Sequence, residues 1–339
     1  MPLNDAELFS ASHATVAGVD EAGLGPMLGP LTLGFSVLRT PAHECDLWKA
    51  LAPLVSDDPQ HDARAFVVAD SKQVFKRTPR CHKRLEATAL GFLALLDPGR
   101  APRTTLARLL FESPAELAVA PPFIARHPWY RQGQRELPAH WEALTLELRV
   151  ESLVRALRRA EIELVDAGVR TLTESALNDS FARTQNKSLT HWEFSAPLFR
   201  RVFERHGADG VELWVDRHGG RSHYGPLLGR TFPEALVEWI DETPQRSRYS
   251  IRTHDRSLRM RIVFAEKAER SSFAVALGSC LAKYARESAM AAFNAYFAAQ
   301  APELAPTAGY TTDARRWLTD AEAVLARLAL SREQFVRER

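Results

Sequence analysis

The stretch that most constrains the fold is VAGVDEAGLGPMLGPLTLGF, at residues 16–35. A short apolar run ends in two neighbouring carboxylates, Asp20 and Glu21, and a turn rich in glycine and proline follows over 22–30. The next run, 31–38, alternates apolar side chains with small or polar ones, as half-buried strands do. This order predicts two strands joined by a tight turn, with both acids at the end of the first strand.

Composition excludes several classes of protein. The 339 residues carry a net charge of only +2, so any surface that binds nucleic acid must be local. Cys45, Cys81 and Cys280 are far apart and form no CxxC pair, which argues against disulfides and a zinc ribbon and favours a reducing cytoplasm. The first ten residues lack a basic region, so no signal peptide is expected, and no apolar run approaches the roughly 20 residues of a membrane helix.

Strand and helix patterns alternate along the chain. Strands are predicted at 16–19, 31–38, 65–70, 162–165, 211–216 and within 249–264, and helices at 85–96, from 141 over about 20 residues, at 189–206 and at 273–297. This alternation predicts an α/β or α+β domain with a central mixed sheet.

The predicted helix over 273–297 has one face of small residues. Ala274, Gly278, Ala282 and Ala285 lie three or four positions apart, so they share a face. We expect this face to approach a sheet closely.

Acids stand at the ends of three predicted strands: Asp20 with Glu21, Asp70 and Asp216, while Glu269 precedes the long helix. Ligands of α/β sheets bind at the carboxyl ends of strands. Carboxylates that meet there repel one another unless a divalent cation neutralises them, and Mg²⁺ and Mn²⁺ prefer such oxygen ligands. The alternative for each single acid is a turn residue or a helix cap, and Asp70 before Ser71 fits a cap equally well.

Other catalytic classes lack their motifs. Ser71 has no GxSxG context, and Gly23 and Gly25 are not followed by the rest of a dinucleotide-binding fingerprint. The histidines lack metal-ligand spacing and are expected to be core or exposed side chains; those considered are His13, His218, His223 and His254.

Five blocks of the sequence, in this order, resemble those of the type 2 ribonuclease H family, ribonuclease HII and HIII. The first, VDEAGLGPMLGP, is similar to the family's DEAGRGPxxGP block, and DSK, VD, a KAE block with its helix, and GYTT follow. These blocks lie at 19–30, 70–72, 215–216, 267–283 and 309–312.

The resemblance implies a ribonuclease H-like fold, in which helices flank a five-stranded mixed sheet. It implies metal-dependent hydrolysis of the RNA strand in RNA–DNA hybrids or in DNA with embedded ribonucleotides, with Mg²⁺ or Mn²⁺ as cofactor. The implied catalytic residues and metal ligands are Asp20, Glu21, Asp216 and Glu269. The implied substrate-binding residues are Gly23, Leu24, Gly25, Ser71, Lys72, Lys283 and Tyr310.

The sequence departs from the family pattern at Leu24, where the family has Arg or Lys. A cationic contact to phosphate is therefore missing, which weakens the expectation of cleavage at single embedded ribonucleotides. Two alternatives stay open: a related nuclease that acts on structured nucleic acid, and a nucleic-acid-binding protein without catalysis.

We expect one catalytic domain over 12–339 with two insertions. A proline-rich one spans 97–140, and an arginine-rich one spans 227–261. The arginines form either an ordinary solvated surface or a patch that tracks phosphates, in which case affinity falls with salt.

Overall fold

The protein was analysed as a computed structural model, which describes residues 8–9, 13–60, 64–97, 99–112, 114, 126–132, 135–219 and 221–338. The strands are β1 Ala14–Ala22, β2 Leu31–Thr40, β3 Val55–Ser56, β4 Phe66–Val67, β5 Thr104–Thr105, β6 Glu136–Leu137, β7 Glu163–Leu172, β8 Val211–Asp216, β9 Ala235–Glu242, β10 Arg246–Thr253 and β11 Arg259–Ala265. The α-helices are α2 Leu47–Leu51, α3 Ser71–Val74, α4 Pro79–Leu93, α6 Ala143–Arg159, α7 Glu174–Thr184, α8 Lys187–His206, α9 Gly225–Thr231, α10 Phe273–Gln300, α11 Thr311–Asp320 and α12 Glu322–Arg327. Short 3₁₀ or π turns are η1 Ala94–Leu96, η2 Arg108–Glu112, η4 Pro128–Gln132, η5 Gly207–Asp209, η6 Ala268–Arg270 and η7 Arg332–Gln334.

A seven-stranded sheet in the order β7-β2-β1-β8-β11-β10-β9 forms the centre of the molecule. β7, β2 and β1 run antiparallel, whereas β8 and β11 run parallel to β1. These five strands are the mixed sheet that the sequence predicts, and helices flank it, so the predicted fold class is confirmed. β10 and β9 extend the sheet with two further antiparallel strands.

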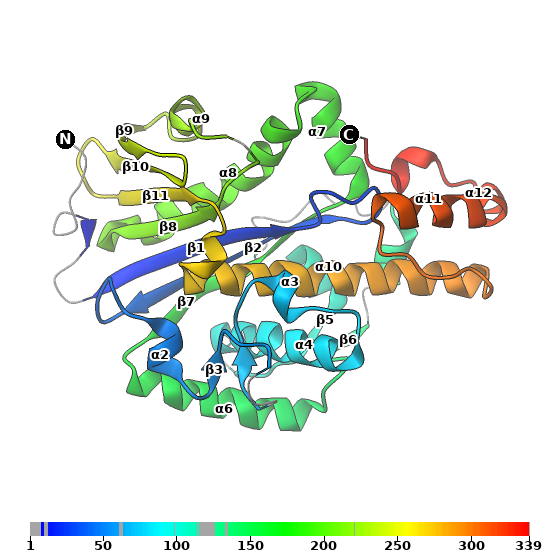
Figure 1. Cartoon of the computed structure of the whole chain (residues 1–339), viewed down its shortest axis with the longest axis horizontal. Helices are drawn as coiled ribbons and strands as arrows, with labels where there is room; N and C mark the ends of the chain where they lie inside the picture. Colours follow the sequence, from blue (N-terminus) through cyan, green and yellow to red (C-terminus); the bar gives the residue numbers. More distant parts are fainter. Residues whose placement is uncertain are drawn as a thin grey trace.

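Helices cover both faces of the sheet (Figure 1). α10 lies along one face against β1 and β2, and α4 and α6 pack beyond it in the same core. α8 and α9 contribute to a second core, on the opposite face. No helix among the described residues is both long and apolar enough to cross a bilayer.

Backbone lies directly on backbone where α10 meets the sheet. A Cβ atom added to Gly34 would lie 2.1 Å from the carbonyl oxygen of Gly278, and one added to Gly18 would lie 2.1 Å from the amide nitrogen of Val275. The Thr32 hydroxyl donates to the carbonyl oxygen of Ala282 at 2.8 Å. The close approach expected from the small-residue face is confirmed.

Some elements differ from the predicted ones. β7 is longer than the predicted strand, because its polar Asp166 is buried in an ion pair with Arg201 of α8 and hides the strand pattern. α7 was not predicted, because its sequence is largely polar, and it begins where the Thr173 hydroxyl accepts from the amide of Ala176.

The two predicted insertions have different environments. Part of 97–140 lies outside the described residues, but Trp129 in η4 is fully buried against Phe293 and Phe297 of α10. Within 227–261, the strand arginines Arg248 and Arg252 pair with Asp241 and Glu238. Because acids neutralise these two guanidinium groups, the phosphate-tracking alternative loses support there.

Candidate active site

Strand register brings three predicted acids to one edge of the sheet. β1 and β8 run in parallel with Val19 opposite Val215, so Asp20 and Asp216 follow on adjacent strands. Asp216 lies opposite Ala265 at the end of β11, and the chain reaches Glu269 in η6 four residues later. The carboxyl ends of these three parallel strands therefore place the acids together.

Asp20 and Glu21 face opposite sides of the sheet. Successive side chains of a strand point to opposite faces. Asp20 faces α10, where it shares a hydrogen bond with the Ser279 hydroxyl. Glu21 faces α8, where its Oε2 lies 3.7 Å from Nε2 of His191. Glu21 therefore follows Asp20 at the same edge of the sheet, but its side chain points to the opposite face, which α8 covers.

Burial and mutual repulsion disfavour the ionised forms of both acids. Burial, opposed by the Ser279 hydrogen bond and assisted by the charges of Asp216 and Glu269, raises the pKa of Asp20 to about 7. Burial and the charge of Asp20 raise the pKa of Glu21 well above its ordinary value. Such a concentration of carboxylates is stabilised by a cation.

The other two acids have the same character. Asp216 Oδ1 accepts the amide of Ala268 at 3.2 Å, yet burial keeps the pKa of Asp216 raised. The pKa of Glu269 is raised by burial and by the charges of Asp216 and Asp70.

The segment at 70–72 contributes one cation and one cap. The charge of Lys72 opposes the pKa increase of Glu21, Asp216 and Glu269. Asp70 caps α3, with Oδ1 accepting the Lys72 amide at 2.9 Å. The buried Ser71 donates its amide to the Ser279 hydroxyl at 3.4 Å and so ties this segment to α10.

The glycine turn lies next to the cluster. Gly23 has a φ of +94°, which favours glycine, whereas Gly25 is exposed and has open space where a Cβ would lie. Leu24 is partly buried against the core on the α8 side. Tyr310 is about half exposed, and the preceding Gly309 accepts the amide of the turn's Met27 at 2.7 Å.

Lys283 lies in α10, but its ammonium group is engaged elsewhere. Its Nζ is 2.6 Å from Glu287 Oε1 and lies over the ring of Phe75. The structure therefore pairs this predicted phosphate contact with an acid of its own helix.

Two arginines that the sequence patterns did not indicate fix the glycine turn by donating hydrogen bonds to backbone carbonyl oxygens. Arg286, which is 1% exposed, donates to the carbonyl oxygens of Pro30, Leu28 and Ala308. Arg337, near the C-terminal end, donates to those of Gly23 and Pro26. Both arginines reach residues that are distant along the sequence, so no local pattern indicates them.

The donor chemistry suits a hard divalent cation, because the four predicted ligands offer only oxygen atoms. In the described part of the chain, however, no three His, Cys, Asp or Glu side chains are arranged so that they could hold a metal ion.

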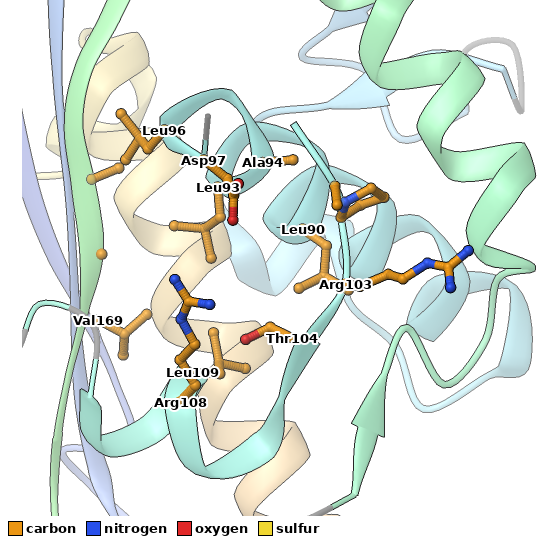
Figure 2. Close-up of a pocket in the computed structure, with 14 residues that line it drawn as sticks. Leu90, Leu93, Ala94, Leu96, Asp97, Arg103, Thr104, Arg108, Leu109 and Val169 are labelled. Carbon is orange, nitrogen blue, oxygen red and sulfur yellow. The ribbon is translucent and has the colours of Figure 1, made fainter. Parts of the chain in front are cut away.

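Two cavities differ in their relation to the acid cluster. One of about 670 Å³ lies beside Glu21's partner His191, and it is lined by Leu24, Lys187, Ser188, His191, His218, Gly219, Arg221, Ser222 and His223. The other, of about 180 Å³, lies between η1, 101–109 and β7, where Figure 2 shows Arg108 reaching toward Leu93 and Val169. None of the four acids lines either cavity, but the first contains Leu24 of the glycine turn and His191, whose Nε2 lies 3.7 Å from Glu21 Oε2, so the first cavity is the one next to the candidate site.

Comparisons with known proteins give structural neighbours alone. No model of a known protein family matches the chain, and no curated protein matches it. Similar solved structures include ribonuclease HII of Archaeoglobus fulgidus in a complex with PCNA, at 14% identity and a TM-score of 0.42, covering 96% of this chain and 94% of that one. Ribonuclease H2 of Pyrococcus horikoshii OT3 has 15% identity and a TM-score of 0.38, covering 95% and 92%.

A third neighbour is a mutant protein of Bst-RNase HIII, at 14% identity and a TM-score of 0.42, covering 97% of this chain and 67% of that one. These neighbours carry the names of the families that the sequence blocks resemble. Identities and TM-scores this low do not assign an activity to this chain.

Proposed function

We propose that the protein is a divergent type 2 ribonuclease H, a metal-dependent endonuclease that hydrolyses the RNA strand of RNA–DNA hybrids. The observation that supports this most is the strand register, which puts Asp20 and Asp216 on adjacent parallel strands and Glu269 just after the next strand, all at one edge of the sheet. Such a cluster suits the hydrolysis of phosphodiesters, where charge develops on phosphate oxygens.

The residues have distinct tasks in this proposal. Asp20, Glu21, Asp216 and Glu269 would hold Mg²⁺ or Mn²⁺ through their carboxylate oxygens. The bound cations would supply Lewis-acid stabilisation to the attacking water and to the leaving 3′ oxygen, which gives 5′-phosphate and 3′-hydroxyl products. Ser279 orients Asp20 through its hydrogen bond. Lys72 places a positive charge where the scissile phosphate enters.

The turn and its neighbour supply the substrate surface. Gly23, Leu24 and Gly25 let a nucleic-acid backbone approach the acids, and Tyr310 offers an exposed ring next to the turn. The 2′-hydroxyl distinguishes RNA from DNA along the backbone. With Leu24 in the turn, we expect little preference for a single embedded ribonucleotide over an RNA tract.

A cleavage assay with Mn²⁺ or Mg²⁺ tests this function on three duplexes: a continuous RNA–DNA hybrid, DNA with one embedded ribonucleotide, and DNA alone. Cutting restricted to the RNA-containing duplexes supports the proposal. Cutting of the all-DNA duplex would favour the alternative nuclease, and binding without any cutting would favour a non-catalytic nucleic-acid-binding protein.

A further inference from the structure

We propose that the cavity beside Glu21 on the α8 side binds one unpaired nucleotide of the substrate strand. The inference rests on the proposed nuclease function and adds a feature of its substrate. The cavity has a volume of about 670 Å³ and lies between the glycine turn, the start of α8 and the loop after β8.

The cavity opens beside the acid cluster. His191 forms part of its wall, and the Nε2 atom of His191 lies 3.7 Å from Oε2 of Glu21. Asp216, at the same sheet edge, precedes His218 of the cavity wall by two residues. A strand whose phosphate reaches the acids therefore passes the mouth of the cavity.

The walls suit a flat heterocycle. The rings of His191 and His218 lie with their centroids 3.9 Å apart, and Leu24 adds an apolar surface from the turn. Nucleobases stack on aromatic and imidazole rings with little dependence on sequence. Within the described residues, His191 Nε2 and His218 Nδ1 are buried and make no hydrogen bond, and Glu21 Oε2 lies 3.7 Å from His191 Nε2, beyond hydrogen-bond distance. Polar groups on the edge of a bound base would supply these hydrogen bonds.

The rim suits the phosphates on either side of that base. Lys187 and Arg221 both line the cavity, and Nε of Arg221 donates to the Ser188 hydroxyl at 3.3 Å. This contact joins the loop after β8 to α8 across the cavity. Cationic side chains around an aromatic floor are the usual composition of a site that holds single-stranded nucleic acid.

The volume of the cavity and the pairing of bases in a duplex determine which nucleotide can enter. A volume of this size accepts a drug-sized ligand, so one nucleoside unit fits. A base within a duplex cannot enter, because its edge is paired and its faces are stacked. The occupant is therefore a nucleotide that is bulged or mismatched close to the cleavage site.

Binding by the Asp20→Asn protein, which the proposed function predicts to be inactive, tests the proposal. Fluorescence anisotropy compares a fully paired RNA–DNA hybrid with the same hybrid carrying one unpaired adenine in the RNA strand. We expect about tenfold tighter binding of the bulged hybrid, a difference of about 1.4 kcal/mol, because the unpaired base stacks in the cavity and the paired one does not.

Ser188→Trp places a large ring in the cavity from a partly exposed helix position. We expect it to abolish the preference, so that the bulged and the paired hybrid bind with equal affinity. Ser152→Trp, on α6 and of similar exposure, is the matched control and should keep the preference.

Equal affinity for the two hybrids, or a preference that survives Ser188→Trp, would overturn the subsite while leaving the nuclease intact. Failure to bind either hybrid would overturn both proposals. Cleavage of the paired hybrid by the wild-type protein distinguishes these two failures.

Discussion

The centre of the sheet and its edges are held together in different ways. At the centre, Gly18 and Gly34 let α10 touch the backbone of β1 and β2. At the edges, charged side chains make the contacts: Asp166 of β7 with Arg201, and Asp241 of β9 with Arg248. The comparison teaches that the acids lie on the least adaptable part of the molecule, where the packed backbone leaves no room for a shift.

The largest expected effect comes from adding one methyl group at the centre. Gly34→Ala should lower the free energy of unfolding by about 3 kcal/mol, because its Cβ meets the Gly278 carbonyl oxygen at 2.1 Å. Denaturant unfolding followed by circular dichroism measures this. Gly229→Ala, in α9 with open space around the added atom, is the control and should be neutral or slightly stabilising. Equal losses of unfolding free energy in the two variants would contradict the claim that the centre of the sheet tolerates no added atom.

The buried ion pair of the β7 edge should come next. Arg201 donates to Asp166 from Nε at 2.8 Å and from Nη2 at 3.0 Å, and both side chains are at most 10% exposed. Asp166→Asn leaves a buried guanidinium without its carboxylate and should cost about 3 kcal/mol at pH 7. Asp209→Asn, at an exposed acid near the same edge, should cost far less.

The same pair predicts a pH dependence. Burial alone would raise the pKa of Asp166, but hydrogen bonds from His206 and Arg201 outweigh it and lower the pKa below its ordinary 3.8. Its contribution to stability is therefore full above that value and is lost as pH falls through the lowered pKa. The free energies of unfolding of the wild type and of Asp166→Asn should begin to approach each other as the pH falls below about 4. A constant difference between them down to about pH 2 would contradict the assignment.

A smaller effect is expected where the centre meets the site. Ser279→Ala removes the hydroxyl that Asp20 and the Ser71 amide share, and it should cost about 1 kcal/mol of unfolding free energy. Metal-dependent cleavage of a hybrid should fall about tenfold in kcat with little change in KM, because Asp20 loses its orientation. Ser279→Thr, which keeps the hydroxyl, should restore more activity than Ser279→Val. No difference between these two variants would argue against a positioning role.

The smallest effect belongs to the outer edge. The Arg248–Asp241 pair is partly exposed, so Arg248→Ala should change the free energy of unfolding by less than about 1 kcal/mol. The Arg248→Ala protein should bind a hybrid with the same salt dependence as the wild type, because Asp241 already neutralises this guanidinium group in the wild type. A clearly weaker salt dependence in this variant would support the alternative that the arginines of 227–261 bind phosphates.

The sequence predicted those parts of the fold whose signals are local. The run into Asp20 and Glu21, the strand into Asp216 and the small face of 273–297 all depend on nearest neighbours along the chain. The order of the five central strands agrees with those patterns, and the register places Asp20 and Asp216 on adjacent parallel strands.

The remaining features depend on contacts between distant segments. The support of the glycine turn by Arg286 and Arg337, and the contact between the tilted rings of His191 and His218, join residues that share no motif. Asp20 and Glu21 point to opposite faces because side chains alternate along a strand. The two acids have different surroundings because α10 covers one face and α8 covers the other. Local sequence patterns carry no information about which distant segments meet.

The most direct test of the acid cluster is the cleavage rate of an RNA–DNA hybrid in Mn²⁺, measured for the wild type, Asp20→Asn and Asp57→Asn. Asp57 is an exposed acid outside the predicted set of metal ligands and serves as the matched control. We predict that Asp20→Asn loses about 1,000-fold or more in rate while its circular dichroism stays native, and that Asp57→Asn cuts like the wild type. Undiminished cleavage by the Asp20→Asn protein would contradict the assignment of the active site to this edge of the sheet.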